Sequence, residues 1–212
     1  MLASSTKISR DEFKNHPLLA RLLTLPQIPK EIYIQGNLPE IKIDELGLSS
    51  PRILTVVGSR KHTTYGKDVV NHLISSLNGQ DVIVVSGLAL GIDALAHKSA
   101  LESDIVTISV PGSGLGKDVL YPRNHTELAK EILSSGGVLL SEYGDTAKAE
   151  QWTFPARNRI MAALSDAVLF IDAEEKSGTY ITARQSIELG RDIGASPGDR
   201  LSPTAFGANM RI

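Results

Sequence analysis

The chain has 212 residues, of which 42% are hydrophobic, enough to fill the core of one large domain, alone or with a short extension. The chain has 22 basic and 24 acidic residues, a net charge of −2, so any site for a polyanion must be a local patch. The sequence contains no cysteine, which excludes disulfides, thiolate metal sites and a cysteine nucleophile, and its five histidines are not spaced as metal ligands.

No apolar run reaches the ~20 residues that a membrane span needs. Charged side chains interrupt the start of the chain from Lys7 onward, so it lacks the apolar core of a secretion signal. The missing cysteines also suit a reducing compartment. We therefore expect a cytoplasmic protein with no membrane contact, no structural metal and no bound cofactor.

The first 50 residues differ in pattern from the rest. An apolar helical stretch at 18–25 is followed by two prolines and a brief extended stretch at 32–34, and a Ser-Ser-Pro turn ends the region. So short a segment cannot hold a core of its own. We expect residues 1–50 to form an N-terminal appendage packed on a main domain of residues 51–212.

From residue 53 onward, short strands alternate with helices. The strand runs are continuous and β-branched, which is typical of strands buried on both faces of a parallel sheet. The predicted strands are 53–57, 82–85, 105–110, 138–140 and 167–171, and the predicted helices are 64–78, 91–102, 125–135, 155–164 and 179–190. This alternation predicts an α/β fold with a doubly wound, mostly parallel sheet. The Gly-, Pro- and Ser-rich stretch 194–212 is expected to wrap the sheet edge or end as a tail.

Small residues follow four of the predicted strands. In a doubly wound sheet, ligands bind beyond the carboxyl ends of the strands, where backbone N–H groups and helix N-termini can approach an anion. Any one of these loops could equally be a tight turn, but together they favour a phosphate site. No Gly-x-Gly-x-x-Gly follows the first strand, which argues against NAD. The candidate positions in these loops are Gly58, Ser59, Arg60, Ser86, Gly87, Gly112, Ser177, Gly178 and Thr179.

Residues 154–160 read Phe-Pro-Ala-Arg-Asn-Arg-Ile, and the proline suits the first turn of a helix, where no N–H donor is needed. Arginines near the positive end of a helix can donate paired hydrogen bonds to phosphate oxygens. Phe154, with Trp152 before it, offers a flat face on which an unpaired base can stack. The alternative is that Phe154 anchors the core and the arginines pair with carboxylates. The polar candidates of this motif are Arg157, Asn158 and Arg159.

Asp93 and His97 lie one helical turn apart and could form an acid–base pair. A capping and orienting contact is the commoner role of such a pair at a helix start. No Gly-x-Ser-x-Gly elbow accompanies Ser86, so the sequence offers no defensible nucleophile.

Five motifs occur in a recognisable order: Gly-Ser-Arg at 58–60, Ser-Gly-Leu-Ala-Leu-Gly-Ile-Asp at 86–93, the motif at 154–160, Ser-Gly-Thr-Tyr-Ile-Thr-Ala at 177–183 and Gly-Ala-Asn at 207–209. In this order they closely resemble the DprA (Smf) family, over roughly residues 16 to 212. The resemblance implies an extended Rossmann-like domain that binds single-stranded DNA and is not an enzyme. It also implies a homodimer that acts as a recombination mediator, loading the RecA recombinase onto incoming strands during natural transformation.

The resemblance also implies roles for individual positions. Arg60 would bind a backbone phosphate, and the turn at 86–87 would line the floor of the pocket. Residues 154–159 would stack on a base and supply further positive charge. The loop lysine Lys148 could extend the DNA track, although a solvated surface lysine is the alternative. Many relatives carry a C-terminal winged-helix-like domain, so the family pattern predicts a minimal member that lacks it.

A second family of similar fold gives the competing hypothesis, the lysine-decarboxylase-like (LOG) nucleotide phosphoribohydrolases. Their Arg-x-x-x-Met motif has a counterpart at 157–161, and their Pro-Gly-Gly-x-Gly-Thr-x-x-Glu loop aligns with 175–182. Thr182 stands where that family has its catalytic carboxylate, and a Thr hydroxyl cannot ionise for that task. Glu188 lies nearly two helical turns further on. DNA binding is therefore favoured over nucleotide hydrolysis, with a catalytically silent nucleotide sensor as a third option.

Overall fold

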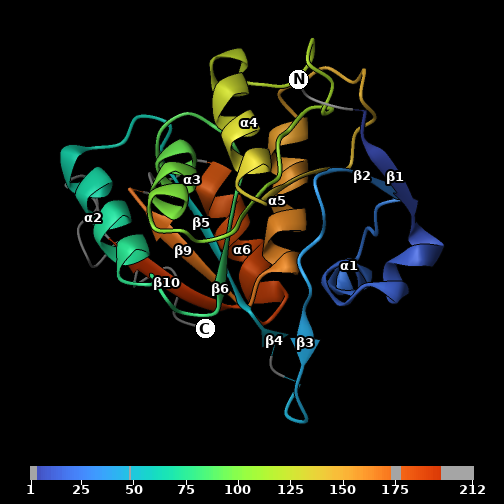
Figure 1. The fold of residues 1–212 in the computed structure, drawn as a ribbon, viewed down its shortest axis with the longest axis horizontal. Coiled ribbons are helices and arrows are strands. Elements are labelled where there is room, and N and C mark those ends of the chain that lie inside the picture. The colour runs from blue at the N-terminus through green and yellow to red at the C-terminus, as the bar shows by residue number, and fades with distance from the viewer. Residues whose placement is uncertain (1–3, 48, 173–177, 197–212) are drawn as a thin grey trace.

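The computed structural model describes residues 4–47, 49–172 and 178–196. Its main element is an eight-stranded sheet in which the six strands from β8 to β10 run parallel (Figure 1). This confirms the predicted α/β class. From one edge to the other the strands are β1 (Thr6–Ser9), β2 (Glu31–Gln35), β8 (Val138–Ser141), β7 (Thr107–Ser109), β6 (Val82–Ser86), β5 (Arg52–Gly58), β9 (Ala167–Ile171) and β10 (Asp192–Ser196).

Helices cover both faces of the sheet, as a doubly wound fold requires (Figure 1). Alternate residues of a parallel strand point to opposite faces, so Ile83 and Val85 of β6 enter one core cluster while Val84 enters another. One face carries α2 (Thr64–Ser75), α3 (Ile92–Glu102) and α4 (Thr126–Ser134), and the other carries α1 (Pro17–Ala20), α5 (Thr153–Leu164) and α6 (Gly178–Glu188).

Element bounds shift from the predicted ones where local geometry decides. Helix α3 begins at Ile92 because Gly91, at φ +76°, ends the preceding turn, and a Cβ there would lie 2.2 Å from the Ser59 carbonyl oxygen. Helix α5 begins two residues before the predicted start, at Thr153. Within 194–212, residues 194–196 form the end of β10, which pairs parallel to β9, and 197–212 lie outside the described residues.

The N-terminal region adds two strands to the main sheet: the predicted extended stretch at 32–34 lies in β2, whereas β1 and the pairing of both strands with the sheet were not predicted. Strand β2 pairs antiparallel with both β1 and β8. Between these strands lie the 3-10 helices η1 (Arg10–Asn15) and η2 (Arg21–Thr24), with α1. Their apolar side chains, including Phe13, share a core cluster with Phe170 of β9. The segment does pack on the main domain, while its treatment as a separate unit ending at residue 50 stays a prediction.

At the amino ends of the parallel strands, Asp166 joins several elements. Its carboxylate accepts hydrogen bonds from the Ile53 N–H at 2.8 Å and the Ser49 hydroxyl at 2.6 Å, and it pairs with Arg21 of η2 at 3.0 Å. Burial by itself raises the pKa of Asp166, but the hydrogen bonds and the Arg21 charge outweigh it and hold this pKa below its ordinary value. Arg21 also donates to the Leu164 carbonyl at 2.7 Å, so both members of this ion pair have further hydrogen-bond partners.

Candidate functional site

A shallow pocket lies at the carboxyl ends of the strands, at the point where the winding of the sheet reverses. Strand β5 has β6 on one side and β9 on the other, and the chain reaches these neighbours over opposite faces of the sheet. The cavity measures about 20 Å³, room for no more than a water molecule, so a polymer would lie across it. Three loops and the first turn of α5 supply its lining: Arg60, Gly87, Ala89, Leu90, Tyr121, Pro122 and Phe154.

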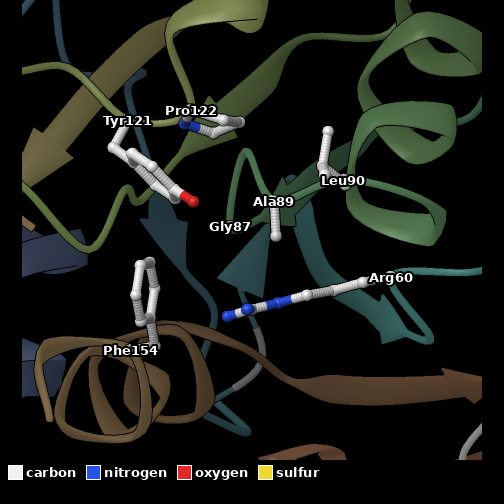
Figure 2. Close-up of a pocket in the computed structure, with 7 residues that line it drawn as sticks. All are labelled: Arg60, Gly87, Ala89, Leu90, Tyr121, Pro122 and Phe154. Carbon is white, nitrogen blue, oxygen red and sulfur yellow. The ribbon is translucent and has the colours of Figure 1, made fainter. Parts of the chain in front are cut away.

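Arg60 is the exposed cation of this pocket. Its guanidinium carbon lies 4.8 Å from the centroid of the Phe154 ring, a cation–π contact. Figure 2 shows the side chain extending across the pocket towards a wall made by Tyr121 and Phe154. Among the described residues, no carboxylate lies within ion-pairing distance of Arg60. Its donors are therefore available to an anion.

Phe154 is enclosed on several sides. A Cβ on Gly112 would lie 2.7 Å from the ring, which shows how closely this glycine approaches it. Tyr121 packs at a tilt, 5.6 Å between centroids, and Arg60 covers part of the remaining surface. Phe154 thus holds Arg60 in place. The aromatic side chain of this pocket with more free surface is Tyr121, 47% exposed, which was not among the candidates chosen from the sequence.

Arg157 lies behind the pocket and is only 5% exposed. Its Nη1 donates to the Gly87 carbonyl at 2.6 Å and to the Val110 carbonyl, and its Nη2 lies 4.0 Å from the Asp93 carboxylate. Burial lowers the pKa of Arg157 from its usual value, against the opposing effect of Asp93. A Cβ on Gly87 would lie 2.0 Å from Nη1. In this arrangement Arg157 binds the ends of β6 and β7 together and presents no donor to a phosphate.

Asp93 and His97 have separate partners. Asp93 accepts a hydrogen bond from the Ala89 N–H at 3.3 Å, a capping contact that shapes the loop after β6, and burial raises its pKa. The His97 ring hydrogen bonds to the Thr107 hydroxyl at 2.8 Å. Burial, with help from the Arg157 charge, lowers the pKa of His97 to about 3, so the ring is neutral at ordinary pH. The two side chains do not form an acid–base pair.

Arg159 faces the other side of α5. It pairs with Glu142, which follows β8, and it contributes to a second, larger groove between α5 and α6. Trp152 also lines that groove, with its ring edge-on to Tyr143 at 5.9 Å between centroids. Phe154 and Trp152 were expected to share one stacking face, and the structure divides them between two hollows.

The remaining candidates lie near the pocket without lining it. Gly58 and Gly112 allow close packing, since a Cβ on Gly58 would lie 1.9 Å from the Ile171 carbonyl oxygen. The Ser59 hydroxyl is used within its own turn, and the buried Ser86 hydroxyl donates to the Val56 carbonyl at 2.7 Å. These residues shape the loops.

Five further candidates have different surroundings. Asn158 is buried and accepts a hydrogen bond from Arg157 Nε at 3.1 Å. Lys148 is exposed in the loop between β8 and α5. Ser177 lies outside the described residues, and Gly178 and Thr179 begin α6. Of the predicted set, the structure thus brings together Arg60, Gly87 and Phe154.

The residues on which the hydrolase hypothesis depends are poorly placed for chemistry. Thr182 is fully buried in α6, and Glu188 at the far end of that helix pairs with Arg184 at 2.9 Å. Within the described ranges, no group of three His, Cys, Asp or Glu side chains could hold a metal ion. None of the helices in those ranges has the length and apolar character needed to cross a membrane.

Comparison with known proteins gives consistent matches. The family model described as DNA recombination-mediator protein A matches residues 9–212. The chain is 39% identical over 178 residues to the DNA processing protein DprA of Bacillus subtilis, covering 84% of this chain and 59% of that protein. Against three curated relatives, the chain spans 49% to 61% of their length.

Two solved structures resemble the whole described fold. The X-ray structure of DprA from Streptococcus pneumoniae matches with a TM-score of 0.79 and 33% identity, covering 98% of this chain and 68% of that one. The DNA processing protein A of Helicobacter pylori, reported for its single-stranded DNA binding mode, matches with a TM-score of 0.73 and 29% identity, covering 93% and 81%.

Proposed function

This chain belongs to the DNA recombination-mediator protein A family, and on that premise we propose that it binds single-stranded DNA and acts as a recombination mediator in DNA processing. The observation that carries the proposal is Arg60, an exposed guanidinium held over Phe154 at the switch point of the sheet. A cation that the protein positions, and that no described carboxylate neutralises, suits a phosphate of a strand lying across the pocket.

In this proposal a backbone phosphate binds Arg60 and an unpaired base stacks on Tyr121, whose ring is partly exposed beside it. Arg157 and Gly87 act as positioning residues, because their contacts fix the loop that carries Ala89 and Leu90. Phosphate contacts and stacking are largely independent of base identity, so binding should show little sequence preference.

The finer parts of the proposal rest on the family resemblance. They are a cytoplasmic location, assembly as a homodimer, and loading of the RecA recombinase onto single strands during natural transformation. Catalysis is not part of the proposed role, since Thr182 is buried and cannot replace a carboxylate. Incubation with AMP should release no ribose 5-phosphate, and robust release that Glu188→Gln abolishes would establish the hydrolase instead.

A salt titration tests the main proposal. Fluorescence anisotropy of labelled oligonucleotides of equal length, one single-stranded and one duplex, should show tighter binding of the single strand, because only unpaired bases can stack. Affinity should fall steeply with salt as counterions are released. Equal affinity for the two forms at every salt concentration would contradict the stacking argument.

A further inference from the structure

The start of α5 separates two hollows of different character. Phe154 lines the pocket that contains Arg60, whereas Trp152 and Pro155 line the groove on the other side. That groove has a volume of about 550 Å³, within the range of sites that bind nucleoside-sized ligands. Its walls come from the loop after β8, the first turns of α5, helix α6 and the loop after η2.

Three side chains of this groove have polar atoms that are buried and make no hydrogen bond: Tyr143 Oη, Arg159 Nη1 and Gln185 Oε1. Buried polar groups in folded proteins are normally paired, and leaving one unpaired is destabilising. Their concentration in one groove indicates a ligand that brings both hydrogen-bond donors and acceptors. A nucleobase edge has this mixture.

The charges of the groove favour a base over a phosphate. Glu142 neutralises Arg159, and Glu150 accepts a hydrogen bond from Trp152 Nε1 at 2.8 Å, so a phosphate would meet carboxylates with no free cation among the described residues that line the groove. The aromatic surface is available, since Trp152 is 59% exposed. An uncharged, planar group with polar edges fits these surroundings.

We propose that the groove binds an unpaired base of the same DNA strand whose phosphate contacts Arg60, and this inference rests on the proposed function. Phe154 lines one hollow and Trp152 lines the other, two residues apart at the start of α5, so one strand can cross this helix N-terminus from one to the other. The base stacks on Trp152, and the Arg159 and Gln185 side chains turn towards it, so that it accepts a hydrogen bond from Arg159 Nη1 and donates one to Gln185 Oε1.

Trp152 is the single tryptophan of the chain, so its emission reports directly on the groove. Titration with oligo-dT should quench this emission with the same midpoint as the anisotropy of the labelled strand. Trp152→Ala, followed by anisotropy, should weaken binding about tenfold, the size expected for one stacked base. Tyr65→Ala removes an aromatic ring of comparable exposure on α2 and should bind as wild type does.

Gln185→Leu gives a second signature, which a merely structural role would not produce. Leucine removes a buried oxygen that lacks a partner, so the melting temperature should stay equal or rise, while affinity for single-stranded DNA falls about three- to tenfold. Gln80→Leu, at an exposed position in the turn after α2, is the matched control and should change neither binding nor melting.

The outcomes separate the two proposals. If Arg60→Ala weakens binding while Trp152→Ala and Gln185→Leu bind as wild type does, the groove inference is wrong and the proposed function stands. If the wild-type protein binds no single-stranded DNA, both are wrong. The Trp152 emission could also stay constant when DNA is added and change with protein concentration. That result would place a second copy of the chain in the groove and would likewise overturn the inference.

Discussion

The two ends of the parallel sheet use arginine in opposite ways. At the amino ends, Arg21 is tied to Asp166, whose carboxylate also accepts two further hydrogen bonds. At the carboxyl ends, Arg60 rests on a ring and has no carboxylate partner among the described residues. What distinguishes the structural end of the sheet, at the amino ends of its strands, from the binding end, at their carboxyl ends, is therefore whether an exposed or partly exposed cation has a carboxylate partner, and not the number of cations. This is why a net charge of −2 does not argue against an anion site.

The largest effect is expected from Arg157, which lies at the binding end but is paired in the manner of the structural end. Arg157→Ala should lower the free energy of unfolding by about 3–5 kcal/mol, because it leaves Asp93 buried and two carbonyls without their donor. Urea unfolding followed by circular dichroism measures this. A variant as stable as wild type would mean that Arg157 belongs with the DNA-binding residues after all.

Asp166→Asn tests the structural end, with an expected loss of about 1–3 kcal/mol at pH 7 from weakened hydrogen bonds and the lost ion pair. The folded-state pKa of Asp166 is lowered, so the carboxylate stabilises the fold above its ordinary pKa and this contribution is lost as pH falls towards the folded value. The difference between variant and wild type, measured by urea unfolding, should therefore be full at pH 7 and shrink below about pH 4. A difference independent of pH would contradict the ionic role.

Arg60→Ala and Arg52→Ala compare two exposed arginines at opposite ends of β5. Neither should change the free energy of unfolding by more than about 0.5 kcal/mol. Arg60→Ala should weaken single-stranded DNA binding about tenfold and reduce the salt slope by about 0.7, the contribution of one phosphate contact. Arg52→Ala should bind as wild type does. A folded Arg60→Ala with unchanged affinity would remove the proposed pocket.

Phe154→Leu should have the smallest effect. Leucine keeps an apolar side chain against Gly112 but removes the ring beneath Arg60, which should weaken DNA binding about two- to fivefold, as expected for loss of an exposed cation–π contact of about 0.5–1 kcal/mol. The salt slope should stay unchanged because no charge is lost. A reduced slope, measured by the same anisotropy titration, would show that Phe154 acts through more than the position of Arg60.

The sequence predicted the parallel sheet because its strands are continuous apolar runs. It gave Arg60 as a candidate because strand-end loops meet at one edge of the sheet, and Phe154 as another because a ring at a helix start can stack on an unpaired base. It predicted the extended stretch that is β2, but neither β1 nor the antiparallel pairing of β2 with β1 and β8, which depends on contacts distant in sequence. The burial of Arg157 likewise depends on Gly87, 70 positions away. That Phe154 and Arg159 point to different sides of α5 could have been predicted from the sequence, since five residues of a helix turn through about 140° beyond a full circle.

The close approach of Arg157 to Gly87 makes the effect of a substitution at one position conditional on the other. Gly87→Ala alone would place its Cβ 2.0 Å from Arg157 Nη1 and force the guanidinium out of its site. In an Arg157→Ala background the same methyl group meets empty space and can partly refill it, so the double variant should be more stable than the sum of the single effects implies. Such epistasis makes the pair easier to exchange together than one residue at a time, whether by drift or by design.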